Sequence, residues 1–125
     1  MNNRKRKEVS DLRSQLWFGK GPYSFPYNSR IMQGGFSKEE FSNKPIIAII
    51  NTWSDMNTCH SHLKDVAEVV KRGIFQAGGF PVELPAMSLG EIMVKPSAML
   101  YRNMLAMETE ELLRSHPVDG VVLLG

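Results

Sequence analysis

Hydrophobic residues become regularly spaced only after residue 44. Residues 46–50 form a short, continuous apolar run of four isoleucines and one alanine. A β-branched run of this length without alternation is typical of a strand that is buried on both faces of a parallel sheet. After a polar segment, residues 51–60, apolar side chains recur at helical intervals, at Leu63, Val66, Ala67, Val70 and Ile74. Gly78 and Gly79 are expected to end this helix.

Two further strands and a second helix are predicted downstream. Residues 80–84 are expected to form a strand that ends at Pro85, and residues 118–124 an apolar third strand. The helix between them is predicted to run from about Ser97 to Ser115, and Pro117 ends it. Its inward-facing side chains are expected to be Leu100, Met104, Leu105 and Leu112, with methionines 87, 93, 99, 104 and 107 filling the core. The order of elements predicts an α/β fold in which a parallel β-α-β-α-β unit has right-handed crossovers.

Residues 1–43 follow neither a strand period nor a helix period. They combine glycines and prolines, which break regular elements, with aromatic side chains at Trp17, Phe18, Tyr23, Phe25 and Tyr27. The aromatic content is too high for a simply disordered segment. We therefore predict an irregular N-terminal arm, residues 1–43, that packs against the rest of the protein or a second subunit. Residues 38–41 could form a short helical turn, and residues 44–125 are assigned to an α/β domain.

Charge and composition change this picture little. The net charge is +2, and four basic residues stand together at 4–7, where we expect a solvated tail rather than a contact with nucleic acid or an anionic membrane. No apolar stretch approaches the ~20 residues that cross a bilayer, and no signal-peptide core follows the basic start. The single cysteine, Cys59, excludes an internal disulfide and favours an intracellular, reducing compartment, which we take to be the cytoplasm.

The candidate chemistry lies in the loops that follow the first two predicted strands. The carboxyl ends of parallel strands share one edge of the sheet, where ligands bind. Cys59 and Glu91 are therefore expected on the same rim. Glu91, like Asp55, suits a magnesium site but is also compatible with an ordinary solvated carboxylate. Candidate partners for a substrate carboxylate, or simply solubilising charges, are Lys64, Lys95 and Arg102.

Cys59 has several chemical interpretations. It precedes a predicted helix, whose free N–H groups favour a thiolate, but a lone cysteine is also commonly a small buried side chain. Chemistry alone leaves a structural cysteine and a metal ligand both open. His60 and His62 offer a base for a cysteine nucleophile. They do not make a zinc pattern, because the second ligand pair and its usual spacing are missing.

These loops and their flanks resemble a known family. The segment IINTWSDMNTCHSHLKDVAEVVKRGIFQAGGFPVELPAMSLGE is similar to the N-terminal signature of the dihydroxy-acid/phosphogluconate dehydratase family. The flanking strings SRIMQGGFSKEEFSNKP and KPSAMLYRNMLAMETEELLRSHPVDGVVLLG resemble it too, so that the similarity covers about residues 12–125. Within the family, NTWSDMNTCHSH and MSLGE are closer to the sugar-acid branch, which includes arabinonate and xylonate dehydratases.

The resemblance implies site residues and cofactors. Cys59 matches the first cysteine ligand of an iron–sulfur cluster, commonly [2Fe–2S] in the sugar-acid branch, and Glu91 matches a magnesium ligand. Family members continue after VVLLG with further ligands to both groups, and the serine base lies further downstream. The resemblance therefore implies that the chain is an N-terminal fragment, that the rest of its domain and a C-terminal domain are absent, and that it holds no catalytic residue.

The function implied is that of a hydro-lyase. The full-length enzyme is expected to convert sugar acids such as arabinonate or xylonate into 2-keto-3-deoxy acids, as a dimer or tetramer that binds neither nucleic acid nor a membrane. We expect the 125 residues alone to be inactive, and poorly soluble or partly disordered because three strands make a small core. One alternative is a dihydroxy-acid dehydratase of branched-chain amino-acid biosynthesis. Another is a non-catalytic α/β module that binds a partner through its aromatic arm.

Overall fold

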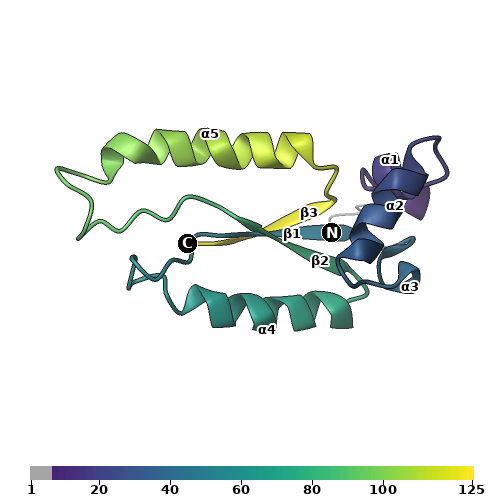
Figure 1. Ribbon diagram of the computed structural model, residues 1–125, viewed down its shortest axis with the longest axis horizontal. Coiled ribbons are helices and arrows are strands. Elements are labelled where there is room, and N and C mark those ends of the chain that lie inside the picture. Colours follow the sequence, from purple (N-terminus) through teal and green to yellow (C-terminus); the bar gives the residue numbers. More distant parts are fainter. Residues whose placement is uncertain (1–6) are drawn as a thin grey trace, which may run out of the picture.

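A three-stranded, all-parallel sheet lies between two helices in the computed structural model, which describes residues 7–125 (Figure 1). Its strands are β1 (Ile46–Asn51), β2 (Phe80–Pro85) and β3 (Gly120–Leu124), and the crossover helices are α4 (Leu63–Gln76) and α5 (Met99–Ser115). The α/β fold with a parallel β-α-β-α-β unit is thus confirmed. The expectation of a solvated basic tail falls mainly on residues 4–6, which lie outside the described residues.

The strand order β2-β1-β3 places β1 at the centre of the sheet. Ile46 is paired with Phe80 of β2, and Ile47 with Gly120 of β3. The first crossover runs from β1 to β2, and the second runs back from β2 past β1 to β3. Because the two crossovers run in opposite directions, right-handed connections put α4 and α5 on opposite faces, as Figure 1 shows. Because side chains alternate between the faces of a strand, Ile49 and its partner Glu83 both point toward α4.

The arm packs against the face of the sheet that is covered by α5. Its elements are the 3₁₀ turn η1 (Val9–Asp11) and the helices α1 (Gln15–Phe18), α2 (Ser24–Gln33) and α3 (Lys38–Phe41). Phe41 is buried with Ile46 and Phe80, and its ring lies 5.9 Å from that of Phe80 and 5.3 Å from that of Phe18. The sequence prediction that the arm packs against the rest of the protein agrees with these contacts.

The arm contains more helix than its sequence pattern indicated. The short turn at residues 38–41 is present, and Ser37 and Glu40 form a reciprocal capping box at its start. The ten-residue helix α2 was not expected, because Pro26 was taken as a helix breaker. Pro26 lies in the first turn of α2, where backbone N–H groups have no partner within the helix, so a proline is tolerated there.

The face that α5 presents to the core differs from the sequence prediction. Leu100 and Met104 were expected to point inward but are 64% and 54% exposed. The methionines at 93, 99 and 107 are also largely exposed rather than core-filling. The reason is that α5 meets the hydrophobic core near its C-terminal end, where Leu113 packs against it. Among the helices of residues 7–125, none is long and apolar enough to cross a bilayer.

One carboxylate joins the arm to two strands. Asp119, just before β3, accepts a hydrogen bond from the backbone N–H of Ile46 at 2.8 Å and one from the N–H of Ser14 at 3.2 Å. Ile46 is the first residue of β1, and Ser14 belongs to the arm. A buried backbone donor that loses its acceptor costs about 1–3 kcal/mol, so this side chain stabilises the junction of three segments.

We expect Asp119→Ala to lower the free energy of unfolding of the native protein by about 2 kcal/mol, because two backbone N–H groups lose their acceptor. The measurement is urea-induced unfolding followed by circular dichroism. Glu111→Ala, which removes an exposed carboxylate from α5, serves as the control and should change the free energy by less than about 0.5 kcal/mol. Equal effects of the two substitutions would contradict the assigned role of Asp119.

Candidate functional site

The carboxyl ends of the three strands lie at one end of the molecule and the arm lies at the other (Figure 1). β1 ends at Asn51, β2 at Pro85 and β3 at Leu124. The connection from β1 to β2 and the connection from β2 to β3 run in opposite directions across the sheet. The boundary between β1 and β3 is therefore the topological switch point of the sheet. Ligands of open α/β sheets bind beyond the carboxyl ends at such a point.

A clasp made of one hydrogen bond and one close backbone approach holds the two candidate loops together. Asn57, which is 5% exposed, donates a hydrogen bond from Nδ2 to Ser88 Oγ at 3.1 Å. Gly90 lies so close to the same side chain that a Cβ at this position would be 3.2 Å from Asn57 Oδ1. Cys59 follows Asn57 by two residues and Glu91 follows Gly90 directly. The structure therefore brings the loops that carry these two residues together at the rim.

Cys59 and Glu91 themselves are both exposed. Cys59 is a free thiol in the turn that precedes α4. The carboxylate of Glu91 forms an ion pair with Arg102 of α5. The same helix holds the loop a second time, because Glu108 accepts a hydrogen bond from the backbone N–H of Met87 at 2.9 Å. Arg102, a sequence candidate for a substrate carboxylate, is thus paired with a carboxylate of the protein itself.

The metal ligands available at the rim are few. Within residues 7–125, no three side chains of His, Cys, Asp or Glu are grouped so that they could hold a metal ion. A [2Fe–2S] cluster is normally held by several cysteines, and the chain has one. Magnesium takes one or two carboxylates together with water or substrate oxygens, and Glu91 is already paired. Residues 7–125 by themselves complete neither kind of site.

The polar end of β1 anchors the first loop. The side chain of the fully buried Asn51 donates to Glu83 at 2.9 Å and to the backbone carbonyl of Leu63 at 3.3 Å. Its Oδ1 accepts a hydrogen bond from the N–H of Trp53 at 3.1 Å. Asn51 therefore connects β2, the start of α4 and the loop that leads to Cys59.

Glu83 is held in its charged form by this network. Its carboxylate lies 2.6 Å from Nζ of Lys71, which is also 2.6 Å from Glu68. Burial alone would raise the pKa of Glu83, but the hydrogen bonds from Lys71 and Asn51 and the charges of Lys71 and Lys64 outweigh it, so that the pKa lies below its ordinary value. Burial likewise opposes the charge of Lys71, yet hydrogen bonds and charges from Glu68 and Glu83 raise its pKa.

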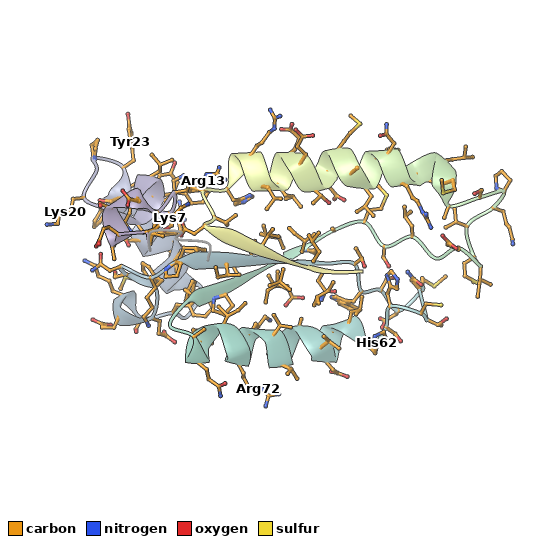
Figure 2. All side chains as sticks on the ribbon, turned by 180° about the vertical axis from the view of Figure 1, so that it is seen from behind. Lys7, Arg13, Lys20, Tyr23, His62 and Arg72 are labelled. Atoms are coloured by element: carbon orange, nitrogen blue, oxygen red, sulfur yellow. The ribbon has the colours of Figure 1, made fainter. Side chains whose placement is uncertain are left out.

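The remaining candidates from the sequence are spread around the rim. Lys64 Nζ lies over the ring of Trp53, 4.9 Å from its centroid. His60 Nδ1 is 2.9 Å from Thr52 Oγ1. His62, in contrast, lies at the N-terminus of α4 and is exposed (Figure 2). Asp55 and Lys95 are exposed as well. The structure therefore engages His60, Lys64 and Arg102 in contacts near the rim.

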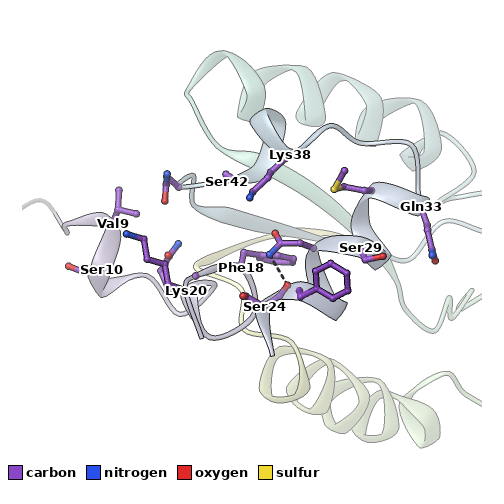
Figure 3. A pocket seen from close by; sticks show the side chains of 15 residues that line it. Val9, Ser10, Phe18, Lys20, Ser24, Ser29, Gln33, Lys38 and Ser42 are labelled. Carbon is purple, nitrogen blue, oxygen red and sulfur yellow. Dashed lines mark hydrogen bonds between the residues drawn. The ribbon is translucent and has the colours of Figure 1, made fainter. Parts of the chain in front are cut away.

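A large cavity lies in the arm, at the opposite end of the sheet (Figure 3). Its volume is about 1080 Å³, and α1, α2 and α3 contribute to its walls. Two lysines, Lys20 and Lys38, line it, and no carboxylate from residues 7–125 does. It shares no residue with the two loops, so it is separate from the candidate site.

Sequence reasoning missed the residues that connect the loops. The hydrogen bond between Asn51 and Glu83 joins residues 32 positions apart, and the one between Asn57 and Ser88 joins residues 31 positions apart. Asn51 carried a usable signal, because it is the first polar residue after a fully apolar strand. Asn57 and Ser88 carried none, since pairing between two irregular loops depends on the path of each backbone.

The ion pair at Glu83 predicts a pH-dependent stability. Because the folded-state pKa of Glu83 is lowered, its contribution is complete above the unfolded-state pKa, about 4.3, and is lost as the pH falls through the folded-state pKa. We expect Lys71→Met to cost the native protein about 1 kcal/mol at pH 7, and the difference from the wild type to shrink as the pH falls below about 4. Thermal unfolding from pH 7 to pH 3 measures it. Arg72→Met, an exposed neighbour, should show no such convergence.

The clasp predicts that the two loops move together. Asn57→Ala and Ser88→Ala each remove the same hydrogen bond, and Gly90→Ala requires the Asn57 side chain to shift by a few tenths of an ångström. Loss of about 1 kcal/mol should speed local opening about fivefold. Hydrogen–deuterium exchange of the native protein should show faster exchange in both residues 52–60 and residues 86–95, with β1 unchanged. A response confined to the mutated loop would show that the clasp does not couple them.

Comparison with known proteins gives the same family as the loop signature. Residues 44–125 match the family described as dihydroxy-acid/6-phosphogluconate dehydratase N-terminal. The 6-deoxy-6-sulfo-D-gluconate dehydratase of Pseudomonas putida is 62% identical over 122 residues, which cover 97% of this chain and 21% of that protein. The L-arabonate dehydratase of Azospirillum brasilense is 50% identical over 115 residues, 91% of this chain and 20% of that protein.

A relative from the other branch is more distant. The dihydroxy-acid dehydratase of Koribacter versatilis is 32% identical over 110 residues, 84% of this chain and 19% of that protein. The chain thus spans about a fifth of the length of the curated relatives it matches. The resemblance to the sugar-acid branch is confirmed by the higher identity of its members. These matches show that the chain belongs to the dihydroxy-acid/6-phosphogluconate dehydratase family.

Proposed function

We propose that this chain is part of a hydro-lyase that dehydrates sugar acids to 2-keto-3-deoxy acids. The observation that carries the proposal is the family match together with the identities of the relatives. The sulfogluconate and arabonate dehydratases, at 62% and 50% identity, are more similar to this chain than the dihydroxy-acid dehydratase, at 32%. The substrates that these relatives suggest are L-arabinonate and 6-deoxy-6-sulfo-D-gluconate, with D-xylonate from a third relative.

The reaction makes definite demands on a site. A proton leaves carbon 2 of the acid, the hydroxyl of carbon 3 leaves as water, and the resulting enol becomes the 2-keto acid. The site needs a base at carbon 2, an acid at the departing hydroxyl and positive charge beside the carboxylate. We assign none of the acid–base roles to this chain, and place the base among residues outside these 125.

In this proposal, Cys59 supplies one ligand to a [2Fe–2S] cluster and Glu91 supplies one ligand to magnesium. The support is their placement: both follow strands at the carboxyl edge, both are exposed, and the clasp of Asn57 holds their loops together. The other ligands would come from residues outside this chain, because its described residues complete neither site. Such metal centres supply Lewis acidity to reactions that release a hydroxyl group.

Glu91 has to exchange its partner for this role. In the structure its carboxylate is neutralised by Arg102. An exposed ion pair is worth only about 0–1 kcal/mol, so a divalent cation can displace the guanidinium at little cost. The proposal also includes a homo-oligomer, a dimer or tetramer, in the reducing environment of the cytoplasm, where the exposed thiol of Cys59 stays available as a ligand.

The test uses the native protein, purified without oxygen and assayed with L-arabinonate, D-xylonate, 6-deoxy-6-sulfo-D-gluconate and a branched 2,3-dihydroxy acid. We expect a 2-keto-3-deoxy acid from at least one sugar acid, at a kcat/KM at least tenfold above that for the branched acid. A preference for the branched acid would favour the amino-acid-biosynthesis alternative. No turnover of any of them would overturn the proposal. The 125 residues alone are expected to be inactive.

The site residues are tested by metal content as well as activity. Cys59→Ser should remove most iron and acid-labile sulfide from the native protein, whereas Thr58→Ser, at the neighbouring exposed position, should retain both. Glu91→Gln should weaken magnesium binding at least tenfold in calorimetry, and Glu111→Gln should not. Unchanged iron in Cys59→Ser would remove Cys59 from the proposed cluster.

A further inference from the structure

The hydroxyl of Thr52 determines which nitrogen of His60 carries a proton. Thr52 is 7% exposed, and its Oγ1 lies 2.9 Å from the backbone oxygen of Leu124 and 2.9 Å from His60 Nδ1. A carbonyl oxygen can only accept, so the single proton of the hydroxyl is donated to Leu124. The hydroxyl oxygen must then accept from His60, whose Nδ1 is the protonated nitrogen.

It follows that Nε2 of the neutral His60 ring is an acceptor. A neutral imidazole has one N–H and one bare nitrogen, and the hydrogen bond of one nitrogen fixes the state of the other. Since Nδ1 holds the proton, Nε2 presents a lone pair. His60 is only partly buried.

This acceptor stands at the switch point of the sheet. Thr52 directly follows β1, and Leu124 is the last residue of β3. The backbone N–H of Thr52 also donates to Leu124, at 3.0 Å. The Thr52 side chain therefore fastens His60 to the boundary between β1 and β3, which is the place where ligands of open α/β sheets bind. His60 is also the neighbour of Cys59 and follows the clasp residue Asn57.

The chemistry of a bare imidazole nitrogen selects one part of a sugar acid. A substrate carboxylate has only acceptor atoms, which cannot pair with Nε2, whereas each substrate hydroxyl has a proton to donate. A site built to bind a hydroxyl discriminates strongly against analogues that lack it, because its own polar atom is left unpaired.

We propose that His60 Nε2 accepts a hydrogen bond from a hydroxyl of the substrate, and that Thr52 is a positioning residue that fixes the tautomer of His60. The inference deepens the proposed function and rests on it for the identity of the substrate. The tautomer itself rests only on the hydrogen bonds of Thr52.

The tautomer is tested by ¹⁵N NMR of the native protein with ring-labelled histidine, at about pH 8.5, where imidazole side chains are neutral. The His60 signals are identified by their loss in His60→Gln. We expect a protonated Nδ1 and a bare Nε2 in the wild type and in Thr52→Ser, which keeps the hydroxyl. Thr52→Val keeps the shape without the hydroxyl and should lose this preference. A protonated Nε2 in the wild type would overturn the assignment, as would a Thr52→Val spectrum identical to that of the wild type.

The substrate contact is tested with two five-carbon acids. L-Arabinonate has hydroxyl groups and pentanoate has none, so only the first should shift the Nε2 resonance of His60 in the wild type. In Thr52→Val we expect KM for L-arabinonate to rise about two- to tenfold, the value of one hydrogen bond, with a smaller change in kcat, and Thr52→Ser should restore it. Equal shifts with both acids, or no shift with either, would overturn the contact.

Failure of the wider proposal gives a different pattern. If the native protein dehydrates no sugar acid but L-arabinonate still shifts the Nε2 resonance, the proposed function is wrong and the contact to a hydroxyl stands. If the protein dehydrates L-arabinonate without such a shift, the proposed function stands and the role of His60 is wrong.

Discussion

The polar end of the central strand is the constraint on which the rest of the structure depends. β1 pairs with both β2 and β3, and three of its four isoleucines are buried between two layers. Where the apolar run stops, Asn51 and Thr52 are still buried and must find partners inside the protein. They do so in three other elements: Asn51 with α4 and β2, and Thr52 with β3. The side chains of Asn51 and Thr52 therefore hold the rim to the strands and to α4.

How well each element could be predicted depended on how locally its structure is determined. The run at 46–50 and the stripe that begins at Leu63 gave β1 and α4 almost to the residue, because an uninterrupted apolar strand and a regular helical stripe need no information from elsewhere. The helix α2 was missed because the position of Pro26 in its first turn depends on where the helix begins. The prediction of the inward face of α5 was wrong, because apolar spacing shows which side of a helix could be buried but not whether another element covers it.

The candidate site divides in the same way. Topology alone predicted that the loops of Cys59 and Glu91 share one edge, since parallel strands end together. The roles of these two residues came from the resemblance and remain proposals. Three contacts could not be predicted from the sequence and are seen only in the structure. They are the clasp between Asn57 and Ser88, the ion pair of Glu91 with Arg102, and the hydrogen bond between Thr52 and His60. Each joins side chains whose approach depends on loop paths that no local pattern encodes.

The strand order also has a consequence for how the chain is made. The centre of the sheet is synthesised first, while both of its neighbours follow later in the sequence. At ordinary elongation rates, roughly 4 to 15 seconds separate the end of β1 from the end of β3. During that interval the most apolar segment of the chain leaves the ribosome with an open edge on at least one side. Unpaired apolar edges invite association with other chains, so the nascent protein is most exposed to aggregation before β2 and β3 have paired with β1.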